Sequence, residues 1–144
     1  MKRIALLSIL LLAAVALAGD AITAGKIEVA PSTPISLGLL VKIPPAFKVA
    51  VDAPFNLDIV SEGPAIAQGP QSFKGKGKDL PYTLHFASGA AGEGALNIKM
   101  MLFVCQADHE GVCQKMDAQI KVPVSVTPNG ANAYDLPIML SPRF

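Results

Sequence analysis

The chain has 144 residues, with 12 lysines and arginines against 11 acidic residues, and a formal net charge of +1. This near balance argues against a polyanionic partner, so no nucleic acid is expected to bind. The length suffices for one domain with a modest core once the first residues are set aside.

The N-terminus has the pattern of a secretory signal peptide, which we place at residues 1–18. Lys2 and Arg3 give a positive start, an almost wholly apolar run follows, and Ala16-Leu17-Ala18 is a small-x-small cleavage site. The apolar run is shorter than the roughly 20 residues that span a bilayer, and no second run of that length follows it. We therefore expect an exported, periplasmic protein with no membrane span in its mature chain.

The mature chain, residues 19–144, is predicted to be a single all-β domain. Residues 19–35 are expected to form a loose lead-in, with one edge strand at Lys26–Ala30. Next come pieces in which apolar and polar residues alternate with the period of two of half-buried strands, at residues 37–43, 47–51, 55–59 and 82–87. Twelve prolines and several glycine clusters separate such pieces. This pattern predicts an antiparallel sandwich of about seven to nine strands, and the role of residues 131–144 stays open.

No motif for hydrolysis or phosphate binding stands out along these pieces. The two histidines, His85 and His109, have no serine that a nucleophile-elbow motif would mark. The GKGKD stretch at residues 75–79 lacks the spacing of a nucleotide-binding loop, so we expect a solvated turn there. Phe73, just before it, is expected to be an ordinary core or surface residue, with a flap over a disulfide as the alternative.

The two cysteines, Cys105 and Cys113, lie in the stretch FVCQADHEGVC at residues 103–113. In an exported protein an even number of cysteines favours a disulfide. If the two face each other across an antiparallel pair, apolar residues meet on one face and polar residues on the other. The apolar pairs are Ile98 with Ile120 and Leu96 with Val122, and the polar pairs are Lys99 with Gln119 and Asn97 with Lys121. The sequence therefore predicts a long hairpin with the cysteines near its tip.

The same alternation places both sulfur atoms on the polar face of the hairpin, where another protein's thiol can reach them. Such access favours thiol–disulfide exchange. A structural staple is the alternative, because closing a loop of about nine residues restricts the unfolded chain by roughly 2.5 kcal/mol. The chain would then be a non-catalytic binding or assembly module.

A wider pattern surrounds the cysteine pair. Between Cys105 and Cys113 the loop carries Asp108 and ends in Gly-x-Cys, and an alternating strand follows at residues 120–124. Upstream, the stretches at residues 43–49 and 52–55 belong to the same pattern. Over residues 37–127 this pattern resembles the N-terminal periplasmic domain of the thiol:disulfide interchange protein DsbD, in which similar stretches lie early in the fold.

The resemblance implies an immunoglobulin-like sandwich with a redox-active hairpin disulfide, formed here by Cys105 and Cys113. It implies no cofactor, and partners that are periplasmic thiol–disulfide proteins, with a membrane-embedded domain as electron donor. The gap between the cysteines is longer than the family leads us to expect, and residues 114–116 replace the expected aromatic and proline residues. No transmembrane or thioredoxin-like section is expected either, so the chain would be a stand-alone member whose donor and acceptor are open.

Copper binding is a third hypothesis, because soft sulfur and imidazole ligands suit Cu(I). The candidate ligands on one loop are Cys105, His109, Cys113 and Met116, with His85, Met100 and Met101 as possible additions. A blue-copper site would also need an upstream histidine at the same end of the sandwich. His85 lies in the middle of an expected strand, and the methionines are expected to pack in the core.

Overall fold

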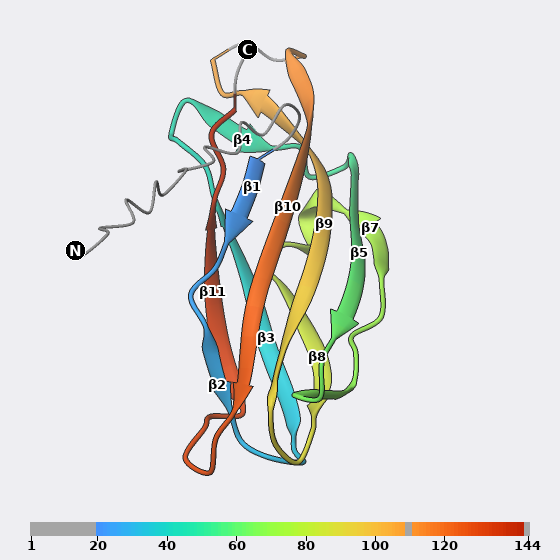
Figure 1. Cartoon of the computed structure of the whole chain (residues 1–144). Helices are drawn as coiled ribbons and strands as arrows, with labels where there is room; N and C mark the ends of the chain where they lie inside the picture. Colours follow the sequence, from blue (N-terminus) through green and yellow to red (C-terminus); the bar gives the residue numbers. More distant parts are fainter. Residues whose placement is uncertain (1–19, 109–110, 143–144) are drawn as a thin grey trace, which may run out of the picture.

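A computed structural model describes residues 20–108 and 111–142 of the chain. Two β-sheets face each other, and a long hairpin runs along the front sheet (Figure 1). The predicted signal peptide at residues 1–18 lies outside the described residues, as do His109 and Glu110. Within the described ranges, no helix has the length and apolar character needed to cross a membrane.

The larger sheet has seven strands in the order β1-β10-β9-β5-β7, with β2 also paired to β10 and β4 to β9. Their bounds are β1 (Asp20–Thr23), β2 (Ile27–Val29), β4 (Phe47–Val49), β5 (Pro54–Glu62), β7 (Phe73–Lys76), β9 (Glu93–Gln106) and β10 (Cys113–Val126). The smaller sheet has the order β11-β3-β8-β6. It comprises β3 (Pro34–Lys42), β6 (Ile66–Gln68), β8 (Tyr82–Ser88) and β11 (Ala133–Met139), and one 3₁₀ turn, η1 (Gly77–Asp79), follows β7.

This arrangement confirms the predicted all-β, immunoglobulin-like sandwich. Strands β3, β8 and β6 share one sheet, as strands B, E and D do in that fold, and β5, β9 and β10 share the other, as do C, F and G. The prediction of purely antiparallel sheets was wrong at the edges, where β1 and β2 run parallel to β10, and β11 runs parallel to β3. Parallel pairing needs a long crossover connection, and strands from opposite ends of the chain have one.

The strand count also exceeds the expected number, since the described residues form eleven strands. Five of them, β1, β2, β4, β6 and β7, have only three or four residues. Pieces that short do not show a clear period of two, so alternation in the sequence could not mark all of them. The expected edge strand at Lys26–Ala30 is present as β2, but the expected loose lead-in also contains β1.

The core lies between the two sheets and is built from alternate residues of their longer strands. On β3, Leu37 and Leu39 are fully buried, and Phe55 and Leu57 on β5 face them from the other sheet. Phe73 packs with the rings of Phe55 and Tyr82 at centroid distances of 6.0 and 4.2 Å. Phe73 is therefore part of this packing, and the alternative of a flap over the disulfide was wrong, because β7 lies two strands away from β9.

The two sheets are joined along one side by β2 and the segment that leads into the last strand, β11. Val29 forms an isolated parallel bridge with Ala131, and the Tyr134 hydroxyl donates a hydrogen bond to the Glu28 carbonyl. Beyond this point β11 lies along the edge of β3, with Ile138 buried against the core. Residues 133–139, whose role the sequence left open, thus add an edge strand that closes this side of the sandwich.

Candidate redox site

Cys105 and Cys113 form a disulfide at the end of the β9–β10 hairpin. The sulfur atoms are bonded at 2.07 Å, and the two Cα atoms are 3.9 Å apart. One residue beyond the pair, the Gln106 N–H donates to the Val112 carbonyl at 2.9 Å. The cysteines therefore occupy the position without backbone hydrogen bonds between them, where opposed Cα atoms approach most closely in an antiparallel ladder.

The register predicted from the sequence is confirmed along the whole hairpin. The structure pairs Ile98 with Ile120, Leu96 with Val122, Lys99 with Gln119 and Asn97 with Lys121. The first two pairs are buried and the last two lie on the outer face of the larger sheet. Both cysteines share the outer face with the polar pairs, so the disulfide does not lie between the sheets.

Access to the two cysteines is nevertheless unequal. Cys113 is exposed, whereas the exposed fraction of Cys105 is only 7%. Cys105 has a strand on each side, because Lys48 of β4 pairs with it from one side and Cys113 from the other. Cys113 is the first residue of β10, and β1 pairs with β10 only from Ala118 onward. The expectation that both sulfurs are accessible therefore holds for Cys113 alone.

The loop beyond the disulfide turns at Gly111, whose φ of +89° is a conformation that side-chain-bearing residues rarely adopt. A Cβ atom at this position would meet no other atom within 4 Å, so only the backbone conformation favours glycine here. Asp108, in the same loop, is exposed. Glu110 and His109, in the same loop, lie outside the described residues.

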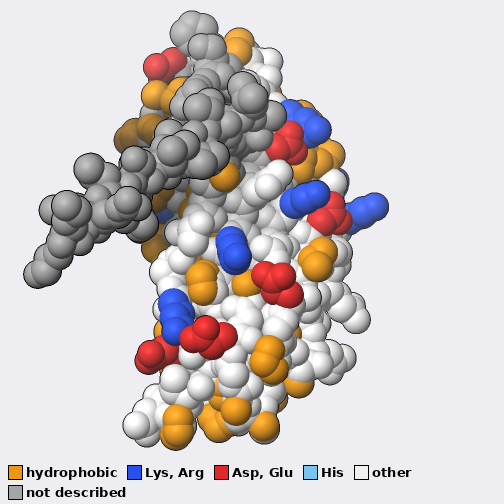
Figure 2. Space-filling model, in the orientation of Figure 1, with side chains coloured by type: hydrophobic (Ala, Val, Ile, Leu, Met, Phe, Trp, Pro, Cys, Tyr) orange, Lys and Arg blue, Asp and Glu red, His pale blue; other side chains and the backbone are white. Residues whose placement is uncertain are grey.

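Two lysines share the outer face with the disulfide. Lys48 is the cross-strand neighbour of Cys105, and its neighbours in β4, Phe47 and Val49, pack against the core, so Lys48 faces outward. Lys115 lies two residues along β10 from Cys113, and its ammonium is 3.7 Å from the Asp117 carboxylate. Figure 2 shows acidic and basic side chains interspersed over the part of this face that grey atoms leave uncovered.

Among the described residues, the proposed copper ligands other than the cysteine pair are not brought to the disulfide, and His109 lies outside those residues. Met100 is buried in the core, and Met116 pairs with Leu102 and packs inward, on the other side of the sheet from the sulfur atoms. His85 lies on β8, in the smaller sheet. Among the described residues, no three His, Cys, Asp or Glu side chains gather as a metal site would require.

His85 has a partner that sequence reasoning missed. It pairs with Ser36 across β3 and β8, and the serine Oγ is 3.2 Å from the histidine Nδ1. Asp135 lies on the same side of this sheet, over Gly38, but β3 separates its strand from that of His85. The pair lies on an exposed sheet face. Because a nucleophilic serine also needs an oriented base and an oxyanion site, the contact between Ser36 and His85 does not by itself make a catalytic site.

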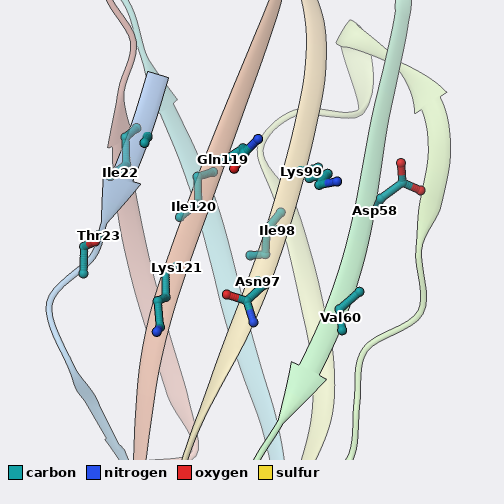
Figure 3. A pocket seen from close by; sticks show the side chains of 11 residues that line it. Ile22, Thr23, Asp58, Val60, Asn97, Ile98, Lys99, Gln119, Ile120 and Lys121 are labelled. Atoms are coloured by element: carbon teal, nitrogen blue, oxygen red, sulfur yellow. The ribbon is translucent and has the colours of Figure 1, made fainter. Parts of the chain in front are cut away.

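A shallow hollow of about 530 Å³ lies on the outer face of the larger sheet (Figure 3). Two rows of cross-strand neighbours from β1, β10, β9 and β5 line it: Ala21, Gln119, Lys99 and Asp58 in one row, and Thr23, Lys121, Asn97 and Val60 in the other. Lys99 is six residues from Cys105 along β9, a separation of about 20 Å at the usual strand rise. The hollow is therefore distinct from the disulfide.

Comparison of the chain with protein-family models and with curated proteins found no match. The resemblance to the DsbD N-terminal domain thus stays a prediction that depends on the motif around the two cysteines.

Proposed function

We propose that this protein exchanges electrons with other exported proteins through the Cys105–Cys113 disulfide. The observation that carries the proposal is the position of the bond on the outer face of a hairpin end, with Cys113 exposed and Cys105 buried. A disulfide with one approachable sulfur and one shielded sulfur gives an attacking thiolate a defined target and a defined leaving group.

The reaction begins when a partner thiolate attacks the Cys113 Sγ. The bond between the two sulfur atoms breaks, and its electron pair leaves with the Cys105 Sγ, which then takes up a proton. The partner's second thiol, once deprotonated, attacks the partner's own sulfur in the mixed disulfide and releases Cys113 as a thiolate. The partner dithiol is oxidised to a disulfide, this chain is reduced by two electrons, and the reverse sequence passes those electrons to an oxidised acceptor.

The expected partners are periplasmic thiol–disulfide proteins, with a membrane-embedded electron donor, as the resemblance implies. The sequence supports this compartment through the predicted signal peptide, and the fold supports the domain type through its immunoglobulin-like strand order. The exposed carboxylate of Asp108 in the loop disfavours thiolate formation at the cysteines. The domain would therefore be a relay whose disulfide is attacked by a better activated partner thiol.

The reduction potential tests the proposal directly. Structural disulfides of exported proteins have potentials below about −300 mV, whereas exchanging disulfides have higher ones. We expect a value above that limit when the intact protein is equilibrated with defined thiol–disulfide buffers. A value well below it would contradict electron exchange.

Trapping identifies the acceptor. The Cys105→Ala variant keeps the exposed thiol and lacks the resolving one, so it should accumulate as a mixed disulfide with an oxidised partner. The Cys113→Ala variant, whose remaining cysteine is shielded, should trap much less. Absence of any mixed disulfide with Cys105→Ala in the exporting cell would count against the proposal.

A non-catalytic binding module with a structural disulfide is the second candidate. The hollow on the outer face favours it, because this surface carries Asp58, Lys99 and Lys121 about 20 Å from the cysteines. In that case the potential falls below the limit given above, and the disulfide contributes only to stability.

A further inference from the structure

We propose that Lys48 is a positioning residue that promotes exchange by stabilising Cys105 as the leaving thiolate. The inference rests on the proposed function, since it concerns the same disulfide. A leaving group departs faster when the pKa of its thiol is lower, and a neighbouring cation lowers that pKa. Lys48 is not part of the cysteine motif, and only the pairing of β4 with β9 brings it to the site.

The placement of Lys48 follows from two registers. β4 pairs Lys48 with Cys105, and β9 and β10 pair Cys105 with Cys113, so the three residues form one row across the sheet. All three share the outer face, because the residues that flank Lys48 in β4 pack inward. Cross-strand neighbours have Cβ atoms about 5 Å apart, and the flexible lysine stem can bring its ammonium to a sulfur at that range.

The order of the row matters for the chemistry. Lys48 is the neighbour of the shielded Cys105, whose sulfur is the leaving group. It lies one strand farther from Cys113, whose sulfur the partner thiolate attacks. The negative charge that develops in the reaction on this chain appears first on the Cys105 sulfur. A cation beside it therefore acts on the step that breaks the bond.

The other charged groups around the disulfide do not duplicate this position. On β10, Lys115 lies two residues beyond Cys113, and its charge is offset by Asp117 at 3.7 Å. Along the chain, the residues two before and two after Cys105, Phe103 on β9 and Ala107 just past its end, are uncharged. In the loop, Asp108 is exposed and opposes the effect of a cation. In contacts among the described residues, Lys48 forms no ion pair.

The first test measures how fast dithiothreitol, a neutral dithiol, reduces the disulfide of the intact protein. At low ionic strength, Lys48→Met should slow reduction about threefold and Lys48→Glu about tenfold. Added salt near 1 M should remove most of the difference, because it shortens the screening length to about 3 Å. Lys74→Met is the matched control, since it deletes the same charge from the outer face of the same sheet, on a strand two away from β9, and its rate should equal that of the parent.

The second test separates stabilisation of the leaving group from attraction of the incoming thiolate. In a Cys113→Ser background, the rate of Cys105 alkylation at pH 8 reports its thiolate fraction. Adding Lys48→Met should raise the pKa of the Cys105 thiol and lower this rate about threefold, while adding Lys74→Met should leave the rate unchanged.

An unchanged alkylation rate with Lys48→Met, or a slowing of reduction that salt does not relieve, would overturn the role of Lys48. Neither outcome depends on a physiological partner. A low reduction potential combined with the predicted Lys48 effects would instead retain the electrostatic role and reject the relay.

Discussion

At the scale of single residues, the proposed exchange depends on two sulfur atoms that share one bond and differ in access. Cys113 begins its strand and is exposed, whereas Cys105 lies between β4 and β10 and is 7% exposed. An attacking thiolate needs an open line to the sulfur, so burial selects the sulfur that is attacked. This assigns to Cys113 the first contact with a partner, a choice that the sequence left undecided.

This asymmetry predicts different reactivity in the two single-cysteine variants. Iodoacetamide should modify Cys113 in Cys105→Ala about tenfold faster than Cys105 in Cys113→Ala, when both rates are expressed per thiolate. Alkylation rates measured across a pH series give both the thiolate fraction and the limiting rate. Equal limiting rates would mean that the burial of Cys105 does not protect its thiol.

At the scale of the element, the β9–β10 hairpin positions the disulfide but does not depend on it. Thirteen residue pairs form the ladder, and buried pairs such as Ile98 with Ile120 anchor it to the core below the tip. The crosslink closes only a short loop at the open end. Reduction should therefore leave the hairpin folded, as a relay that cycles between two redox states requires.

Removing the crosslink should cost at most about 2.5 kcal/mol in the free energy of unfolding, the value expected for a loop of this length. We expect the Cys105→Ala/Cys113→Ala variant to unfold in urea at a lower midpoint with an unchanged slope. Reduced wild-type protein is the control, because it lacks the bond and keeps the sulfur atoms. Loss of the β-sheet signal in either protein before urea is added would contradict the independence of the hairpin.

At the scale of the whole molecule, β2 and the last strand, β11, close one side of the sandwich. β2 and β11 belong to different sheets, and they meet at the bridge between Val29 and Ala131 and at the Tyr134–Glu28 hydrogen bond. Ile138 on β11 is buried in the core, while its neighbour Met139 is 67% exposed. The end of the chain therefore stabilises the fold that supports the β9–β10 hairpin.

Two neighbouring substitutions test this closure. Ile138→Ala should lower the free energy of unfolding by about 2–5 kcal/mol, because it leaves a cavity in the core. Met139→Ala removes an exposed side chain of similar size and should change it by less than about 0.5 kcal/mol. Urea denaturation measures both values, and a similar small effect from the two variants would show that β11 does not pack as described.

The sequence predicted the parts of this structure that depend on residues close to one another along the chain. Alternation of apolar and polar residues correctly placed Leu37, Phe55 and Leu84 in the core. It marked β4 within the expected strand at residues 47–51, but it did not mark β6, β7 or β11, since β6 and β7 have only three or four residues and β11 carries Pro137. The Ser36–His85 pair was missed for a related reason, because it forms between strands 49 residues apart in the chain.

By itself, the sequence determined the register of the hairpin and the face on which its cysteines lie. Both follow from one physical requirement, that apolar residues on two consecutive strands meet on the side that is removed from water. Only the tertiary structure decided that Cys105 is shielded and that Lys48 lies beside it. Those features come from the pairing of β4 with β9, strands more than 40 residues apart whose contact depends on the packing of the whole sheet.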